Sequence, residues 1–373
     1  MNIAIDCRVL EKKITGIGRY LSDLLEGLAK TDFQNEYYLF SQSEIYIGNN
    51  EFTFIHTGKS FFSSKLSSPF WLNFTLPKYL KKYKIDLFFT PNHLIPLKIF
   101  IENIKTVIVI HDLAHKVNKS YHSFFYNIYL NVSLGHSIKN CDSVITVSNN
   151  SKSDIVKYFN VSLEKINVIY EHIGKQFKPI IVNESDKIKL KQKFDISEDF
   201  ILYVGVIEKR KNIISILRIS DILKKHKIPL KVVLIGRPGY GFNKLKKEII
   251  LRKDIVQYLS DVKDDDLIKI YNLAKVFIFP SYFEGFGLPP LEAMSIGVPV
   301  VVSNSSSLPE VVGENIPTFD PKDYYGFTKE IEKLYNDNEY YKKMKVKVLE
   351  RTKHFSREVN ISNLLNVFNK FKY

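Results

Sequence analysis

Short apolar runs recur along the chain, and longer amphipathic segments separate them. In the first half the runs occupy residues 3–5, 52–55, 87–89, 106–110, 143–147 and 167–169. In the second half they occupy residues 201–204, 231–235, 255–259, 276–279 and 300–302. Short β-branched runs that alternate with helix-length segments predict parallel strands covered by helices on both faces. Two such series predict an α/β protein with two doubly wound domains.

The same pattern suggests where the domains divide. Periodicity is weakest, and charges are mixed, around residues 174–197, which we interpret as a linker. We therefore expect an N-terminal domain over residues 1–175 and a C-terminal domain over residues 190–352. The apolar periodicity of residues 356–371 predicts a final helix. The apolar positions expected on one face of this helix are Val359, Leu364, Leu365 and Phe368.

Length and composition agree with this fold class. The chain has 373 residues, of which 45% are hydrophobic, and this argues against disorder. The N-terminus enters an apolar run directly, without a basic leader, and no uncharged apolar stretch approaches the roughly 18 residues of a membrane span. Cys7 and Cys141 lie far apart and have no metal-type spacing. We expect a cytoplasmic protein with reduced cysteines.

Positive charge is concentrated in parts of the chain. The net charge is +14, and residues 201–250 hold twelve Lys and Arg against three Asp and Glu. Residues 51–100 hold seven against two. A basic surface attracts phosphate, whether on a nucleotide, a nucleic acid or an anionic membrane. Composition alone leaves these partners open.

The strongest motif is FEGFGLPPLEAM at residues 283–294, directly after an apolar run. Gly285 and Gly287 allow a ligand to approach the backbone closely. Pro290 suits the first turn of a helix, whose N-terminus favours a phosphate. Glu284 and Glu292 lie within the same motif. Because a carboxylate repels phosphate, their presence indicates a ligand that also carries hydroxyl groups, as a sugar and a ribose do.

This motif, with GVPVV at residues 297–301 and LPEV at 308–311, resembles the family-4 retaining glycosyltransferases, which have the GT-B fold and two glutamates separated by seven residues. The resemblance covers nearly the whole chain. It implies two Rossmann-like domains that face a central cleft, with the final helix, residues 355–373, packed back on the first domain. It also implies that Glu284 contacts the transferred sugar and Glu292 the ribose. Backbone amides from Phe286 to Leu288 would hold sugar and phosphate.

A second cluster follows the apolar run 201–204. Gly205 makes a turn after the strand, and Arg210 and Lys211 come just before a predicted helix. Two cations at a strand end suit a diphosphate whose charge grows as the glycosidic bond breaks. The family has a similar G-x-x-x-x-R-K-N stretch, which implies that Lys211 first and Arg210 second bind the donor diphosphate.

Two further positions in the second half are expected near the nucleotide. Gly236 follows another apolar run and begins a tight turn. The resemblance places the nucleotide base near Tyr258. A dinucleotide fingerprint with an acidic residue at the expected offset is missing from the sequence, which argues against NAD.

The first half carries glycines and a histidine at expected strand ends. Gly16 and Gly18 belong to TGIGRY, which is similar to the family's segment after its first strand. The two glycines would let this loop close over the donor phosphates or sugar. His111, in an H-D segment that the family shares, is our candidate for a catalytic contact with the sugar. His93 is a weaker candidate on the acceptor side.

Two features admit a second interpretation. The D-x-D pattern at residues 264–266 suggests a metal in other glycosyltransferase folds, but here Asp264 suits a helix N-cap and its neighbours suit the helix dipole. We therefore expect no metal and no cofactor.

Residues 61–84 mix Phe70, Trp71 and Phe74 with lysines. They predict either a core-facing helix with a solvated lysine side or a face that docks on an anionic membrane.

Together these observations predict a retaining hexosyltransferase. It would move a hexose or 6-deoxyhexose from a nucleotide-diphosphate sugar to a glycan or lipid-linked glycan. The resemblance favours mannosyl- or rhamnosyltransferases of bacterial surface polysaccharides. The alternatives are a GT-B nucleotide-sugar epimerase or hydrolase and a non-catalytic nucleotide-sugar-binding protein. We expect no nucleic-acid partner, because no recognised nucleic-acid motif is present.

Overall fold

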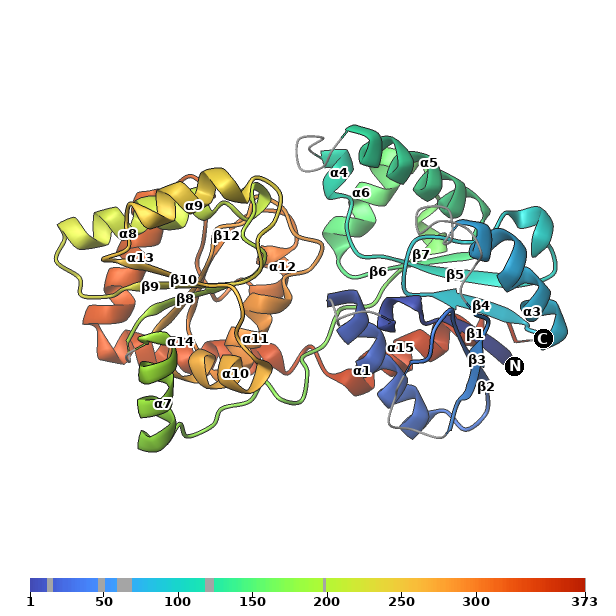
Figure 1. The fold of residues 1–373 in the computed structure, drawn as a ribbon, viewed down its shortest axis with the longest axis horizontal. Coiled ribbons are helices and arrows are strands. Elements are labelled where there is room, and N and C mark those ends of the chain that lie inside the picture. The colour runs from blue at the N-terminus through green and yellow to red at the C-terminus, as the bar shows by residue number, and fades with distance from the viewer. Residues whose placement is uncertain (12–15, 46–50, 59–68, 118–123, 197–198, 373) are drawn as a thin grey trace. The chain divides into compact units, whose positions relative to one another are not determined.

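The computed structural model describes residues 1–11, 16–45, 51–58, 69–117, 124–196 and 199–372. These residues form two compact units. The first contains the described residues up to Glu171 and the segment from Arg357 onward, and the second contains residues 172–356. Each unit is an open parallel sheet with helices on both faces (Figure 1).

The sheet of the first unit has seven strands in the order β3-β2-β1-β4-β5-β6-β7, and every pairing is parallel. The strands are β1 (Asn2–Asp6), β2 (Glu36–Ser41), β3 (Thr53–His56), β4 (Leu87–Thr90), β5 (Lys105–Ile110), β6 (Ser143–Thr146) and β7 (Ile166–Val168). The helices are α1 (Gly16–Thr31), α3 (Leu76–Lys82), α4 (Ala114–Val117), α5 (Phe124–Asn140), α6 (Asn149–Phe159) and α15 (Arg357–Asn369). A π-helical turn, η2 (Trp71–Thr75), leads directly into α3.

The sheet of the second unit has six parallel strands in the order β10-β9-β8-β11-β12-β13. The strands are β8 (Ile201–Val204), β9 (Val232–Ile235), β10 (Val256–Leu259), β11 (Val276–Phe279), β12 (Val300–Ser303) and β13 (Thr318–Phe319). The helices are α7 (Glu184–Phe194), α8 (Ile213–Lys225), α9 (Phe242–Ile250), α10 (Asp264–Leu273), α11 (Leu288–Ile296), α12 (Leu308–Val312), α13 (Tyr324–Asn336) and α14 (Asn338–Thr352). Helices α8, α9 and α13 cover one face, and α10, α11 and α14 cover the other (Figure 1).

Alternation along the strands explains why both faces need a helical layer. In β1, Ile3 and Ile5 belong to the core that α1 and α15 complete, whereas Ala4 belongs to the core on the opposite face. Successive side chains of a strand point to opposite faces. Because both sets are apolar here, the sheet is stable only when helices cover both sides.

Helix α15 packs against α1 within the first unit. Arg357 Nη2 lies 2.8 Å from Glu26 Oε2, and Ile361 of α15 is buried. A Cβ on Gly27 of α1 would meet the Ile361 side chain at 2.6 Å, so the two helices approach closely because position 27 has no side chain. The end of the chain therefore completes the core of its first half.

The strand order places the change of direction between β1 and β4 in one sheet and between β8 and β11 in the other. Open α/β sheets bind ligands outside the carboxyl ends of their strands at this switch point. The segments that follow β8 and β11 are therefore the first place to look for a site in the second unit.

Three expectations from the sequence need correction. Strands β2 and β13 were missed, because β2 is a run of aromatic residues next to a glutamate and β13 has two residues. Residues 174–197 are no linker: they contain α7 and belong to the second unit, which begins at His172. Val359 is 54% exposed, because the buried face of α15 is offset from the expected one. Its buried residues are Asn360, Ile361, Leu364, Val367 and Phe368.

Candidate active site

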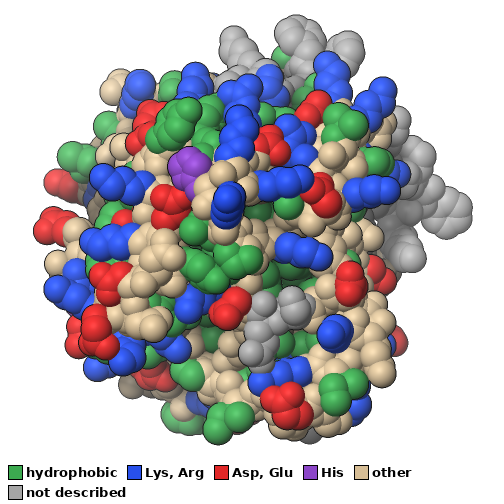
Figure 2. Space-filling view, turned by 90° about the vertical axis from the view of Figure 1, so that its left-hand side faces the viewer, with side chains coloured by type: hydrophobic (Ala, Val, Ile, Leu, Met, Phe, Trp, Pro, Cys, Tyr) green, Lys and Arg blue, Asp and Glu red, His purple; other side chains and the backbone are tan. Residues whose placement is uncertain are grey.

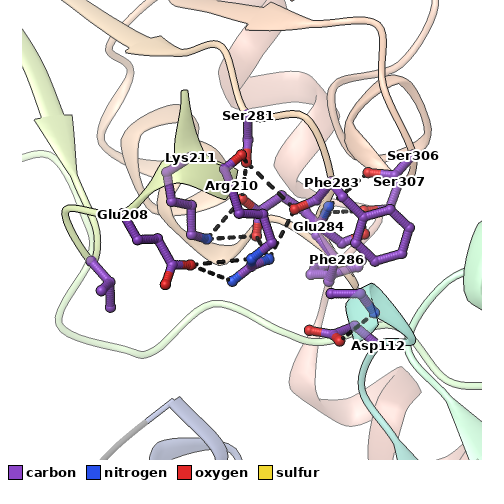
Figure 3. A network of polar contacts seen from close by, with 12 residues as sticks. Asp112, Glu208, Arg210, Lys211, Ser281, Phe283, Glu284, Phe286, Ser306 and Ser307 are labelled. Carbon is purple, nitrogen blue, oxygen red and sulfur yellow. Dashed lines mark hydrogen bonds and ion pairs between the residues drawn. The ribbon is translucent and has the colours of Figure 1, made fainter. Parts of the chain in front are cut away.

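The segments after β8 and β11 meet through a buried ion pair. Lys211 Nζ lies 2.7 Å from both carboxylate oxygens of Glu284 (Figure 3). The two residues are 8% and 6% exposed. Ser281 Oγ also donates a hydrogen bond to Glu284 Oε1. The carboxylate therefore has a fixed orientation, and the lysine charge is held at the carboxyl edge of the sheet.

Arg210 ties the two segments together from the side. Its Nη1 donates to the carbonyl oxygen of Phe283 at 2.9 Å and lies 3.4 Å from Glu284 Oε2. Its Nε donates to Glu208 Oε1 at 3.1 Å. The backbone follows the same path, because the N–H of Tyr282 donates to the Arg210 carbonyl at 3.0 Å. The cluster thus contains two cations and two carboxylates.

The cluster perturbs the protonation of its lysine. Burial lowers the pKa of Lys211, and Arg210 acts in the same direction, while Glu284 opposes both. A buried lysine that loses its carboxylate partner would lose the main stabilisation of its charge. Any anionic ligand that approaches Lys211 would take over that role.

Serines hold the glycine-rich loop after β11. The N–H of Glu284 donates to Ser306 Oγ at 2.8 Å, and Ser307 Oγ donates to the carbonyl of Phe286 at 2.6 Å. Gly287 has a φ of +123°, and a Cβ there would meet Leu308 Cδ2 at 2.9 Å. Glycine is therefore required at this position, immediately before α11. Gly285 is buried but has no positive φ, and the Phe286 ring packs edge-on against Phe355.

Glu292 lies on α11, which begins at Leu288. Position 292 is beyond the first turn, so a role in favouring the helix dipole does not account for it. Its side chain is buried, and its Oε2 accepts a hydrogen bond from the Tyr271 hydroxyl at 2.9 Å. Glu284 and Glu292 are therefore both oriented carboxylates, but they have different partners.

Gly205 and Gly236 lie against each other after neighbouring strands. A Cβ on Gly236 would lie 1.8 Å from the Gly205 carbonyl oxygen, and Gly236 has a φ of +156°. The Tyr258 hydroxyl donates to the Gly236 carbonyl at 2.9 Å. The structure thus brings all three of these predicted residues to one edge of the sheet, where close backbone packing explains the glycines.

In the first unit the predicted residues also follow β1, β4 and β5. Gly16 begins α1, and residues 12–15 before it lie outside the described part of the chain. Gly18 is buried on the same helix. His93 follows β4, and burial lowers its pKa to about 4. His93 Nε2 is buried and has no hydrogen-bond partner among the described residues.

His111 is bound at both ring nitrogens. Nδ1 lies 3.1 Å from Glu171 Oε1, and Nε2 lies 3.0 Å from the Pro91 carbonyl oxygen. Burial opposes the charged ring, but the hydrogen bond and charge of Glu171 outweigh it and raise the pKa of His111. The ring also packs edge-on against Tyr20. A sugar hydroxyl would have to replace one of these two bonds to reach a ring nitrogen.

Two protein families account for most of the chain. The model for Glycosyltransferase Family 4 matches residues 14–173, and the model for Glycosyl transferases group 1 matches residues 184–351. O-antigen chain mannosyltransferase B of Escherichia coli is 31% identical over 293 residues, which cover 78% of this chain and 75% of that protein. This chain belongs to the family-4 glycosyltransferases.

A second relative of this glycosyltransferase is much longer. The serotype-specific mannosyltransferase WbdA of Escherichia coli is 31% identical over 260 residues, which cover 68% of this chain and 32% of WbdA. The chain therefore spans about a third of the length of this relative.

Solved structures agree on the fold. A sucrose-phosphate synthase from Thermosynechococcus elongatus superimposes with a TM-score of 0.79 at 18% identity, covering 99% of this chain and 98% of the other. The lipopolysaccharide glycosyltransferase WaaG has a TM-score of 0.74 at 12% identity, covering 98% and 99%. At these identities the likeness shows the fold alone. The predicted GT-B class, with two Rossmann-like parallel-sheet domains, is confirmed.

Several residues that contact the predicted site residues were missed in the sequence. Ser281, Ser306 and Ser307 fix the loop around Glu284, and Tyr271 and Glu171 orient a predicted site residue each. Ser281 and Ser306 follow strands β11 and β12, a position that could have drawn attention to them. Tyr271 and Glu171 carry no local signal, because their partners lie 21 and 60 positions away.

The aspartates at 264–266 lie in the first turn of α10. The expected N-cap at Asp264 is wrong by one position: the cap is Lys263, and the helix begins at Asp264. Within the part of the chain that the structure describes, no group of three or more His, Cys, Asp or Glu could hold a metal ion. The same residues include no helix long and apolar enough to cross a membrane.

Proposed function

We propose that this glycosyltransferase transfers a sugar from a nucleotide-diphosphate donor to a glycan acceptor with retention of the anomeric configuration. The buried Lys211–Glu284 pair carries the proposal, because it puts a cation and a carboxylate together at the switch point of the second sheet. A cation there suits the diphosphate, and a carboxylate suits sugar hydroxyls. Such a pair fits a ligand that carries both groups.

We assign the donor contacts as follows. Lys211, assisted by Arg210, binds the diphosphate, and Glu284 binds the transferred sugar. Glu292, held by Tyr271, binds the ribose, and amides of the loop before α11 bind sugar and phosphate. We propose that Gly16 and Gly18 also serve donor binding, as the resemblance of their segment to the family implies.

The reaction proceeds by substitution on one face of the sugar. The bond between the anomeric carbon and the β-phosphate oxygen breaks, and a bond from that carbon to the acceptor oxygen forms. The acceptor proton passes to the leaving phosphate. Lys211 and Arg210 stabilise the charge that develops on the diphosphate. We propose that His111, held by Glu171, contacts the sugar and that neither a metal ion nor a cofactor takes part.

Mannose is the first donor sugar to test, followed by a 6-deoxyhexose. The two mannosyltransferases of Escherichia coli described above, each 31% identical to this chain, support this choice. They also support a role in surface-polysaccharide synthesis, with a glycan or lipid-linked glycan as the acceptor, and hence a cytoplasmic setting.

Peripheral membrane contact is a further part of the proposal. Phe70 and Phe74 are 36% and 48% exposed, and their ring centroids lie 5.0 Å apart. Exposed Lys78 follows on α3. Trp71, expected on the same face, is fully buried in the core instead. Exposed aromatic rings beside lysines suit an anionic membrane surface.

A donor panel tests the proposed function. The purified protein is incubated with GDP-mannose, GDP-rhamnose and UDP-sugars, with and without a mannose-terminated acceptor. Release of nucleoside diphosphate only with acceptor, together with a retained anomeric configuration in the product, supports it. Turnover of the donor without acceptor would indicate the epimerase or hydrolase instead. Binding without turnover of any donor would indicate a non-catalytic binding protein.

A further inference from the structure

Helices α8 and α9 of the second unit leave a groove of about 1050 Å³ between them, here called the α8–α9 groove. Its floor is apolar, with Ile214 and Leu217 from α8 and Leu245 from α9. Its rim is cationic. The cationic residues are Lys209, Arg218, Lys244, Lys247 and Arg252.

Two acidic groups at the groove share one arginine. Arg252 Nε lies 3.0 Å from both carboxylate oxygens of Asp221 on α8, and its Nη1 lies 2.9 Å from Glu248 on α9. These bonds also tie the two helices together at this end. Within the described ranges, Lys209, Lys244 and Lys247 form no ion pair. The five cations that line the groove therefore outnumber these two carboxylates, and the groove carries excess positive charge.

Large apolar side chains lie exposed beside these cations. Tyr240 at the groove is 58% exposed, and Ile214 is 36% exposed. Figure 2 views the end of the second unit that carries α8, and Lys and Arg side chains gather there around hydrophobic ones. Exposed apolar surface among cations is typical of a binding surface.

We propose that the α8–α9 groove binds a phosphate ester that carries an apolar group. The lysines without an ion pair bind the phosphate, and the apolar lining with Tyr240 covers the apolar part. The site is distinct from the donor contacts: Lys209 lines the groove, while the adjacent Arg210 and Lys211 bond to the loop after β11. The proposal does not rest on the proposed transfer reaction. A phospholipid headgroup and a soluble phosphorylated metabolite share this chemistry.

The test compares two double variants. Lys244→Ala with Lys247→Ala removes two groove lysines. Lys343→Ala with Lys353→Ala removes the same charge from exposed lysines of the same unit outside the groove. Binding is measured with vesicles of phosphatidylcholine with and without phosphatidylglycerol, and with hexyl phosphate as a soluble ester. Neither pair belongs to the proposed donor site, and the unfolding temperature of each variant serves as the check on folding.

For a lipid source, we expect the groove variant to bind phosphatidylglycerol vesicles about 30-fold more weakly than the parent, from the usual contribution of a lysine at an anionic surface. The control variant should retain most of the binding. For a soluble source, hexyl phosphate binding should be lost in the groove variant only. If both variants bind both probes equally, the proposal is wrong. Displacement of hexyl phosphate by a nucleoside diphosphate would also overturn it, because the groove would then be part of the donor site. Absence of transfer by the parent protein, with intact groove binding, would count only against the proposed function.

Discussion

The buried Lys211–Glu284 pair makes a prediction that couples stability to activity. Glu284→Gln keeps the shape of the side chain but removes its charge. Lys211 would then be a buried cation, with the second cation Arg210 3.4 Å from position 284 and Glu208 the neighbouring carboxylate. Removing one partner of a buried pair costs about 3–5 kcal/mol, because the other charge is left uncompensated. For a unit of this size that corresponds to a fall in Tm of about 6–20 °C.

The second half of the prediction is a double-mutant cycle. Lys211→Met should also destabilise, because it leaves Glu284 as a buried carboxylate with a weaker partner. The double variant should be more stable than the sum of the two losses predicts, since it removes both charges. Transfer should fall in all three variants, and losing one preorganised charged donor typically costs about 10²–10³ in rate.

The assay pairs calorimetric unfolding with steady-state release of nucleoside diphosphate, measured well below each variant's Tm. Lys224→Met is the matched control, because Lys224 pairs with Asp254 on the surface instead of in the core. It should leave both measurements nearly unchanged. Two single variants that melt like the parent, or single effects that merely add in the double variant, would refute the argument.

Three further predictions concern metal and pH. Transfer activity should survive a metal chelator. The double variant Asp264→Ala with Asp266→Ala should have a lower Tm but a nearly unchanged turnover. Strict dependence of the parent on a divalent ion, with activity lost in this variant, would contradict the prediction. The raised pKa of His111 means that its contribution to stability is complete below the ordinary value of 6.5 and is lost as the pH rises through the raised pKa. In the Glu171→Gln variant, the free energy of unfolding from urea curves should no longer fall over this pH range. If its pH dependence matched that of the parent, the pairing of His111 with Glu171 would be contradicted. His93, with its pKa lowered to about 4, acts in the opposite sense: its contribution is present above 6.5 and disappears as the pH falls towards 4. NMR titration of the His93 ring should give a pKa of about 4. A pKa near the ordinary value of 6.5 would contradict the effect of burial.

The sequence was enough for the α/β class, for most of the strands, and for the glycine and carboxylate motifs. Strand–helix alternation and the loops after β8 and β11 depend on local patterns, because apolar periodicity and turn residues act over a few positions. The GT-B class followed from the resemblance of these motifs to the family. Glu284, Lys211 and Gly287 could be singled out for the same reason. The short β13 could not, since two residues carry no periodicity.

Tertiary structure alone decided how these residues are partnered. Lys211 and Glu284 are 73 positions apart, and only the strand order, which puts β8 beside β11, brings them within 2.7 Å. The sequence predicted that Lys211 binds the diphosphate and that Glu284 binds the sugar. Their spacing along the chain did not indicate that the two side chains contact each other. The neighbours Phe70 and Trp71 show the same limit: one is 36% exposed and the other fully buried. Composition gives both the same apolar character, and burial depends on what the rest of the chain places against each side chain.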